Sequence, residues 1–287
     1  MPSAQRSMLI VIPLTLLLLI TPSVKGERVW FGDSKNFHVI EGKDYNAHNI
    51  FVANGTTLTL ESGTIVAPES GDDGESAIRV DDATFIAKKG KISGGLGVGG
   101  TGVTISTTRD SEYPPGSATF EAGVEVYGGD ATRERTTKGG DAVQVLQAGS
   151  RAVINGGKFV PGTGCTVKAC GTATGDGNAL QVVQGEAIIK GGTFEGVLYN
   201  VGGDIALYGC VKFDKETAKI SGVLRDGSPI DIVYKGQKTL PSITYESKVC
   251  PPVAHSPSLE SGGGKAAGRV ALIIIGLYLL GTKSMLK

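Results

Sequence analysis

Apolar and polar positions alternate along most of this chain, in a short pattern that recurs. The pattern is an apolar or small residue, any residue, a second apolar residue, two variable positions, a glycine, any residue and a third apolar residue. It is clearest in two nearly identical copies, AVINGGKF at 152–159 and AIIKGGTF at 187–194. Further copies occupy 58–65, 85–92, 124–131 and 205–213, the last with its glycine one place early and an extra residue. Alternation places every second side chain on one face of a strand, and the glycine permits a sharp corner. Each copy therefore predicts two short strands joined at a glycine corner.

A second strand-like pattern lies upstream of several copies, at 50–52, 77–80, 142–145 and 179–182. The predicted unit is therefore strand, turn, strand, glycine turn, strand. Three short strands cannot bury a core alone, whereas stacked units can. Stacking would align an internal ladder of Ile65, Ile92, Phe159 and Phe194. The sequence predicts an all-β protein, a right-handed parallel β-helix (solenoid) with terminal caps. An antiparallel sandwich or barrel stays open, because alternation does not reveal strand direction.

The segments VINGGKFVPG and IIKGGTFEG resemble the right-handed parallel β-helix, or pectin-lyase-like, superfamily over residues 49–213. The resemblance implies the fold and raises one activity, a polysaccharide lyase or glycoside hydrolase. The Asn-Thr-Asp and Gly-His-Gly signatures that a resemblance to polygalacturonases would require are absent from the sequence.

The N-terminus has the layout of a secretory signal peptide. Arg6 precedes the apolar run MLIVIPLTLLLLI at 8–20, and a more polar stretch follows to Gly26. The run is shorter than the roughly 20 residues that span a bilayer. We expect residues 1–26 to be removed, and an uncleaved anchor helix is the alternative.

The C-terminus carries a second apolar run, VALIIIGLYLL at 270–280. In one interpretation Ser261 and Gly262 form a GPI attachment site, GKAAGR is the polar spacer and the tail is removed. In the other, residues 266–282 form a short transmembrane helix flanked by Arg269 and Lys283. Both interpretations anchor the protein to a membrane, and a buried core helix is the remaining alternative.

These patterns divide the chain into six segments. We expect a signal peptide (1–26), an N-terminal cap (27–48), β-helix repeats (49–213), C-terminal cap strands (214–250), a flexible stalk (251–264) and a hydrophobic anchor segment (265–287). Asp226-Gly227 predicts a turn between two of the cap strands.

Composition excludes one class of partner and indicates the compartment. The chain has 28 basic and 28 acidic residues and 44 glycines, so it lacks the basic surface of a nucleic-acid binder. All four cysteines lie in the exported part, where disulfides form. Proximity favours Cys165–Cys170 and Cys210–Cys250, although three pairings are possible. Asn54 begins an N-glycosylation sequon, Asn-Gly-Thr.

No group of residues reads as a catalytic, metal or cofactor site. Asp81-Asp82 is interpreted as a solvated turn. Asp72, Asp73 and Glu75 are interpreted as an acidic loop without the ligand spacing of a calcium site. The glycines of 94–100 are assigned to loop flexibility, because no phosphate-binding Lys-Ser/Thr follows them. The three histidines join no cluster.

The longer insertions suggest where a partner could bind. They occupy 66–75, 95–116, 130–140 and 161–177, each after the third strand of a unit. Loops at one corner of a stack emerge on one side. We therefore expect one loop edge that carries Glu69, Arg109, Tyr113 and Arg133, with tolerated surface variation as the alternative.

The sequence thus predicts a non-enzymatic, membrane-anchored cell-surface protein with a structural, adhesive or ligand-binding role. Its ligand at the loop edge would be a polysaccharide or a protein, although the edge has few aromatic residues for stacking on sugars. A divergent polysaccharide lyase or glycoside hydrolase is the alternative. An ice-binding array is disfavoured, because Thr57-x-Thr59 is not repeated at matching positions of the aligned copies. The sequence does not indicate the oligomeric state.

Overall fold

The described part of the protein is all-β, and its strands form one large, nearly closed sheet. The computed structural model describes residues 27–32, 36–69, 75–97, 99–108, 111–131, 138–165, 175–236, 240–246 and 248–250. These residues contain 21 strands. Contacts divide the chain into Met1–Pro251 and Pro252–Lys287. The second unit lies outside the described residues, as do the expected signal peptide, stalk and anchor. No helix long and apolar enough to cross a membrane occurs in the described part.

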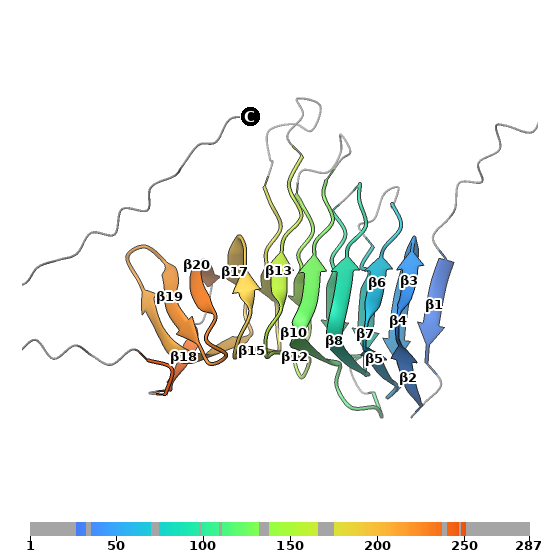
Figure 1. The fold of residues 1–287 in the computed structure, drawn as a ribbon, viewed down its shortest axis with the longest axis horizontal. Coiled ribbons are helices and arrows are strands. Elements are labelled where there is room, and N and C mark those ends of the chain that lie inside the picture. Colours follow the sequence, from blue (N-terminus) through green and yellow to red (C-terminus); the bar gives the residue numbers. More distant parts are fainter. Residues whose placement is uncertain are drawn as a thin grey trace, which may run out of the picture. The chain divides into compact units, whose positions relative to one another are not determined.

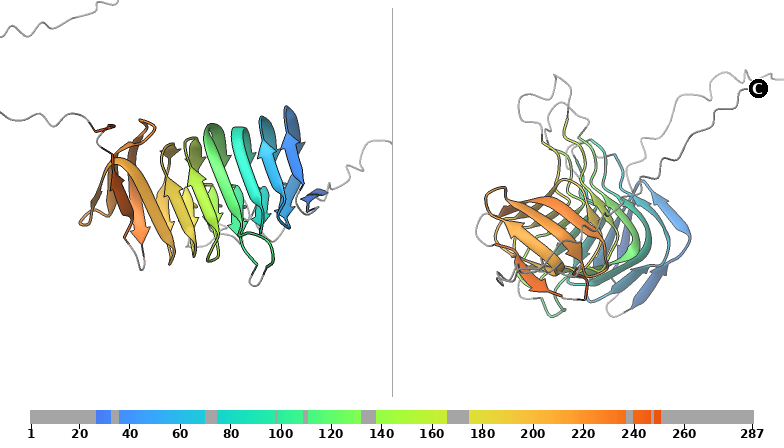
Figure 2. Two further views of the ribbon diagram at one scale, coloured as in Figure 1. Left: turned by 90° about the horizontal axis from the view of Figure 1, so that it is seen from below. Right: turned by 60° about the vertical axis from the view of Figure 1, so that its left-hand side comes forward.

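Most strands belong to three parallel stacks. Each of the first six passes of the chain contributes one strand segment to each stack, and the last two passes contribute to the first and second stacks only. We call one pass a rung. Successive rungs lie side by side in chain order, from blue to orange in Figures 1 and 2. The first stack contains β1 (Glu27–Phe31), β4 (His48–Ala53), β7 (Ile78–Asp81), β9 (Val103–Ser106), β11 (Val143–Val145), β14 (Leu180–Val182), β17 (Val197–Asn200) and β20 (Pro229–Gly236).

The other two stacks share the long strands β8 and β10. The second stack contains β2 (Phe37–Ile40), β5 (Thr57–Leu60), β8 (Thr84–Ser93), β10 (Ser117–Tyr127), β12 (Arg151–Ile154), β15 (Glu186–Ile189), β18 (Asp204–Asp214) and β21 (Ser242–Tyr245). The third contains β3 (Lys43–Asn46), β6 (Gly63–Val66), the second halves of β8 and β10, β13 (Lys158–Val160) and β16 (Thr193–Phe194).

The core is a set of side-chain ladders inside the three stacks. The predicted ladder of Ile65, Ile92, Phe159 and Phe194 is confirmed, with Val126 between Ile92 and Phe159. A run of aromatic rings crosses the same rungs: the ring of Phe120 lies 6.4 Å from Phe85 and 5.5 Å from Phe159, and Phe159 lies 5.1 Å from Phe194. The first three of these phenylalanines are fully buried. Stacked rungs therefore bury what one rung alone would expose.

The register corrects one copy of the repeat. The copy expected at 124–131 is wrong: Ala118 pairs with Phe85 and Ala152, and Val126 pairs with Ile92 and Phe159. The true copy runs from Ala118 to Val126, and a register irregularity between Phe120 and Gly123 adds one residue to it. That extra residue disguises the copy, because Val126 follows Gly123 by three residues, whereas Ile92 follows Gly90 by two.

The two ends of the stack differ. Residues 27–46, expected to belong to a cap, form the first rung, with all three strands paired in parallel to the second. At the other end β19 (Lys219–Leu224) pairs antiparallel with β18 and β20. The turn at Asp226-Gly227 between β19 and β20 is confirmed, with Gly227 at φ 90°.

Glycine corners and glycine ladders hold the rungs close together. Gly90 has φ 128°, and a Cβ there would collide with the carbonyl oxygen of Gly63 in the preceding rung. Beyond the third stack, backbone hydrogen bonds connect successive glycines, with N···O distances of 2.7–2.9 Å: Gly129 to Gly100, Gly140 to Gly129, Gly162 to Gly140 and Gly177 to Gly162. The flexible-loop interpretation of 94–100 is therefore wrong for its described residues. Their glycines allow backbones to touch where a side chain would not fit.

Candidate functional site

An open groove lies over the corner between the first and second stacks. It forms where three consecutive rungs turn, at 146–150 between β11 and β12, at 183–185 between β14 and β15, and at 201–203 between β17 and β18. Its volume is about 560 Å³. The lining residues are Ala148, Gly149, Ser150, Arg151, Gln184, Gly185, Glu186, Gly202, Gly203 and Asp204. A smaller hollow of about 260 Å³ adjoins it, shares Ala148 and Gln184, and adds Thr107 and Gln147.

The floor of this groove is backbone, because the turns are short and rich in glycine. Gly185 has φ 92°, and a Cβ on it would meet the carbonyl oxygens of Ser150 and Gln147. A Cβ on Gly203 would in turn meet the carbonyl oxygen of Gly185. Buried Asn200 fixes this last turn, since its amide donates to the Gly203 carbonyl (2.9 Å) and accepts from the Gly203 N–H (3.0 Å). Consecutive turns therefore stack without side chains between them.

Three charged side chains form one row along the groove. Arg151 pairs in register with Glu186, which pairs with Asp204. Arg151 Nε lies 3.1 Å from Glu186 Oε2, and these side chains are 51% and 44% exposed. Asp204 is exposed. The row therefore combines one ion pair with one further carboxylate, all open to solvent.

Hydrogen bonds connect the groove to the loop 107–116 between β9 and β10. The hydroxyl groups of Ser150 and Thr107 lie 2.8 Å apart, and Gly116 N–H donates to Thr107 Oγ1 (3.0 Å). Gln147 accepts from the Thr107 N–H at 3.1 Å. Ser150 and Gln147 thus already have structural partners, whereas exposed Gln184 has a side chain available to a ligand.

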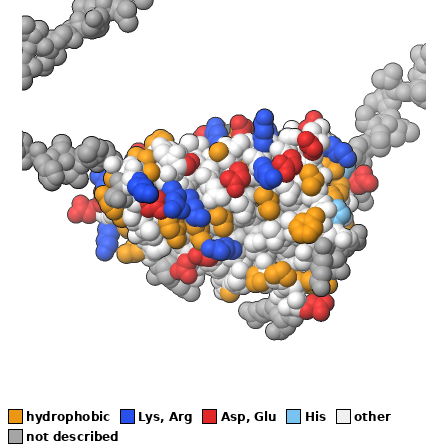
Figure 3. All heavy atoms as spheres, turned by 60° about the horizontal axis from the view of Figure 1, so that its bottom comes forward, with side chains coloured by type: hydrophobic (Ala, Val, Ile, Leu, Met, Phe, Trp, Pro, Cys, Tyr) orange, Lys and Arg blue, Asp and Glu red, His pale blue; other side chains and the backbone are white. Residues whose placement is uncertain are grey.

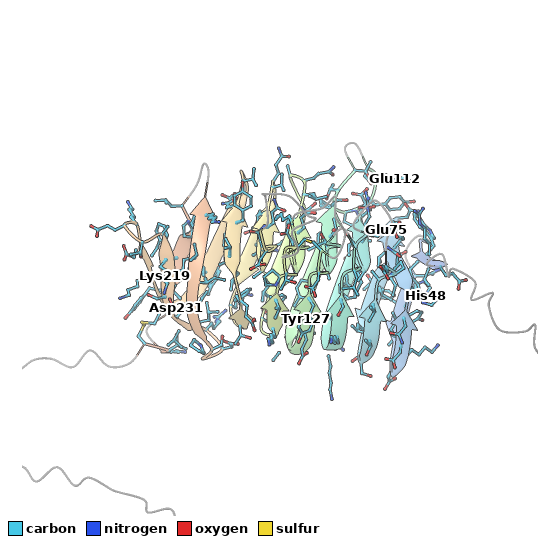
Figure 4. All side chains as sticks on the ribbon, turned by 90° about the horizontal axis from the view of Figure 1, so that it is seen from above. His48, Glu75, Glu112, Tyr127, Lys219 and Asp231 are labelled. Carbon is cyan, nitrogen blue, oxygen red and sulfur yellow. A yellow bond between two sulfur atoms is a disulfide. The ribbon has the colours of Figure 1, made fainter. Side chains whose placement is uncertain are left out.

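This loop also corrects two expectations. Residues 107–116 precede the second stack instead of following the third, and residues 103–106 of the expected insertion form strand β9. Figure 4 accordingly shows Glu112 and Tyr127 at opposite edges of the view. The expected loop edge therefore divides between two corners. Of its residues, Arg109 and Arg133 lie outside the described part.

The pair Asp81-Asp82 anchors the loop, so its interpretation as a solvated turn is wrong. Asp82 is 5% exposed, and both its carboxylate oxygens accept from the Thr108 N–H, at 3.0 and 3.1 Å. Asp81 accepts from the Ser106 hydroxyl and from Arg79 Nε (2.7 Å). These hydrogen bonds occupy the two carboxylates, and they hold a tight corner in which Asp82 has φ 49°.

The described members of the acidic loop and the described histidines lie apart from the groove. Glu75 makes an ion pair with Arg28 at 3.5 Å, and Asp72 and Asp73 lie outside the described residues. His38 and His48 belong to the first two rungs. In the part of the chain that the structure describes, no three His, Cys, Asp or Glu side chains are grouped to hold a metal ion.

The predicted modification sites have mixed outcomes. The Cys210–Cys250 disulfide is confirmed, with a Cα–Cα distance of 5.0 Å. Cys165 is disulfide-bonded, and Cys170 lies outside the described residues, as do Ser261 and Gly262. Asn54 stands in the turn between β4 and β5 at φ 55°, and its half-buried amide donates to the Gly32 carbonyl (3.2 Å).

A second charged surface covers the third stack. Tyr127 donates its hydroxyl to Glu125 (2.8 Å), Lys91 Nζ lies 4.7 Å from the Tyr127 ring centroid, and Lys158 pairs with Glu195 (3.0 Å). The hydrogen bond to Glu125, aided by burial, raises the pKa of Tyr127 above its usual 10.0. Basic and acidic side chains are interspersed on the face in Figure 3. Interspersed charges of both signs are typical of a solvated surface and not of a binding patch of one sign.

The groove could have been found from the sequence. Arg151, Glu186 and Asp204 each immediately precede the first apolar residue of a repeat copy. Reading that column across copies would have aligned them. The apolar columns define the core and therefore do not reveal this row on the surface.

Comparison with known proteins adds no further constraint. No family model matches the chain, and neither the curated proteins nor the solved structures contain a significant match. The fold and the groove therefore carry the functional argument alone.

Proposed function

We propose that this chain is a non-enzymatic, membrane-anchored cell-surface protein that binds a neutral polysaccharide in the groove over rungs 5–7. We further propose that its fold is a right-handed parallel β-helix. The three parallel stacks support this assignment, as does the resemblance of VINGGKFVPG and IIKGGTFEG to that superfamily. Crossovers between parallel strands of one sheet are right-handed in about 98% of cases, which favours that hand.

The groove itself is the observation that carries the binding proposal. Its floor offers backbone groups, and its walls offer Gln184, Arg151, Glu186 and Asp204. Such donors and acceptors suit a ligand rich in hydroxyl groups. One cation and two carboxylates leave the row with a net negative charge, so a polyanion would be repelled. An uncharged polysaccharide is the ligand class that fits best.

Binding can be tested by titrating the purified protein with neutral and acidic polysaccharides in a calorimeter. Gln184→Ala should weaken binding of the neutral ligand about fivefold, since a typical hydrogen bond contributes about 1 kcal/mol. The matched control is Gln181→Ala, because Gln181 bonds Gln144 on the outer face of the first stack (2.7 Å), outside the groove. Equal affinity of both variants, or a preference for the acidic polymer, would contradict the proposal.

One observation favours a second candidate function, a polysaccharide lyase or glycoside hydrolase. Glu186 and Asp204 are register neighbours on separate rungs, and a glycosidase needs two carboxylates beside the scissile bond. Against this, Glu186 is already ion-paired and both acids are open to water, whereas catalytic acids work best in a water-excluded site. Turnover that is abolished by Glu186→Gln would favour the enzyme and sink the non-enzymatic proposal.

Export and anchoring are proposed from the terminal segments. Release of surface protein by a phosphatidylinositol-specific phospholipase would identify a GPI anchor, and resistance with the tail retained would identify a transmembrane helix. Glycosylation at Asn54 can be checked with Thr56→Val. Thr56 is fully buried and its hydroxyl has no partner in the described structure, so this variant should lose the glycan's mobility shift without losing stability.

A further inference from the structure

The outward face of the second stack carries a regular block of uncharged, mostly β-branched residues. In each strand of this stack, the first and third residues point away from the core. In rungs 2–4 these positions form a block of three pairs, one pair per rung. We call this set the threonine block: Thr57, Thr59, Thr84, Ile86, Ser117 and Thr119.

The register shows that the block is a two-dimensional array. Thr57 pairs with Thr84 and Thr59 with Ile86, and Ser117 and Thr119 continue these two rows. Adjacent rungs are about 4.8 Å apart, and alternate residues along a strand about 6.7 Å. The irregularity in β10 begins only after Phe120, beyond the block. The Thr-x-Thr pair itself is not repeated, since the matching positions carry Thr84 and Ile86 and then Ser117 and Thr119, but five of the six residues present a hydroxyl group in register.

The side chains of the block are rigid and available. Five of the six are β-branched, with few χ1 rotamers, and all six are half-buried. The Thr84 and Ser117 hydroxyls lie 3.3 Å apart. Within the described residues, the hydroxyls of Thr57, Thr59 and Thr119 have no hydrogen-bond partner. The block thus presents methyl and hydroxyl groups in fixed rows.

The block differs from the neighbouring outer face in charge. At equivalent outward positions the third stack carries Asp44, Lys91, Glu125 and Lys158. The block itself contains no charged side chain. Charged residues border it on two sides: Glu61, Lys88 and Glu121 stand two residues beyond its second row, with Lys88 Nζ 2.7 Å from Glu61 Oε1, and Arg151 follows its first row. The block is therefore complementary to an uncharged partner.

We propose that the threonine block binds ice. Methyl groups and hydroxyls that repeat in two directions can order water into a layer that joins a crystal lattice, whereas charged groups would orient water toward themselves. A single sugar chain repeats in one direction and is usually held by aromatic rings, and the block contains none. This proposal concerns rungs 2–4 and is independent of the groove.

The test is partition of the purified full-length secreted protein into a slowly grown ice hemisphere, together with inhibition of ice recrystallisation. The variant Thr59→Lys places a charge at the first position of the second row, which consists of Thr59, Ile86 and Thr119. Its matched control is Thr64→Lys, because Thr64 is a half-buried threonine of the same rung on the outer face of the third stack. Circular dichroism should confirm that both variants fold.

We expect the natural protein and Thr64→Lys to enter the ice and inhibit recrystallisation. Thr59→Lys should need at least about tenfold more protein for equal inhibition, which corresponds to about 1.4 kcal/mol. Exclusion of the natural protein from ice, or equal activity of the two variants, would overturn the proposal. Binding of a neutral polysaccharide that is lost in Thr59→Lys, without ice activity, would also overturn it and assign the block to that polymer.

Discussion

Phe120 is the residue at which the stacked core can be tested most directly. Its side chain is fully buried, and its ring contacts the rings of Phe85 and Phe159 in the two neighbouring rungs, at centroid distances of 6.4 and 5.5 Å. Phe120→Ala would remove both ring contacts and leave a cavity between two rungs that cannot easily close. Phe-to-Ala changes in cores cost about 3–5 kcal/mol, of which each aromatic pair contributes about 0.5–1.5 kcal/mol. We expect a loss of about 4 kcal/mol in the free energy of unfolding.

The assay is equilibrium unfolding in urea followed by two probes. Circular dichroism reports on all strands, and the fluorescence of Trp30, the only tryptophan, reports on the first rung. Two probes are needed because each rung contacts only its neighbours, so rungs can unfold separately. Phe37→Ala serves as control, since Phe37 is 81% exposed and should change stability by less than about 0.5 kcal/mol.

The refuting outcome is a small effect in the core. If Phe120→Ala cost less than about 1.5 kcal/mol, or no more than the control, the ring would not be packed between two rungs. A loss seen by fluorescence alone would place the damage in the first rung, away from Phe120. Either result would refute the stacking of Phe85, Phe120 and Phe159.

Three further predictions concern the corners, the disulfide and the charged surface. Gly90→Ala should destabilise the protein by more than about 2 kcal/mol in urea, because its Cβ would strike the preceding rung, whereas Gly42→Ala, also at positive φ but with nothing within 4 Å, should cost only about 1 kcal/mol. Cys250→Ser should cost about 4 kcal/mol by the loop-closure model for a separation of 40 residues, which thermal unfolding with and without reductant can check. The raised pKa of Tyr127 means that its contribution to stability is complete below pH 10 and is lost as the pH rises through that raised pKa. Urea unfolding across this range should show the decline, and Glu125→Gln should reduce it; an unchanged decline would assign it to other groups.

The inward half of the fold could be predicted from the sequence, because burial imposes a repeated chemistry. Phe159 and Phe194 occupy one internal column, and their copies differ little, so the ladder could be aligned without knowledge of strand direction. The copy at 118–126 could not be aligned in the same way. The strand accommodates the extra residue as a local irregularity in the register. In the sequence, however, the same residue breaks the regular spacing of apolar positions by which the other copies align.

The weaker strands and the glycine ladders were harder to predict. Strand β9 follows a glycine-rich segment and has only Val103 and Ile105 as inward residues. Nothing in a single sequence separates a glycine that confers flexibility from one that allows close packing. Gly129 and Gly140 are of the second kind, and only the positions of the neighbouring backbones show it.

The groove and the threonine block share one physical origin. A stack of parallel strands turns each sequence position into a column, so one residue type repeated at one position becomes a continuous surface. Inward columns must be apolar, which leaves outward columns free to vary. At the start of each second-stack strand that column changes from Thr57 and Thr84 to Arg151 and Glu186 along the same face. One face can therefore carry two chemically different surfaces, an uncharged array over rungs 2–4 and a charged groove over rungs 5–7, without any change to the core beneath them.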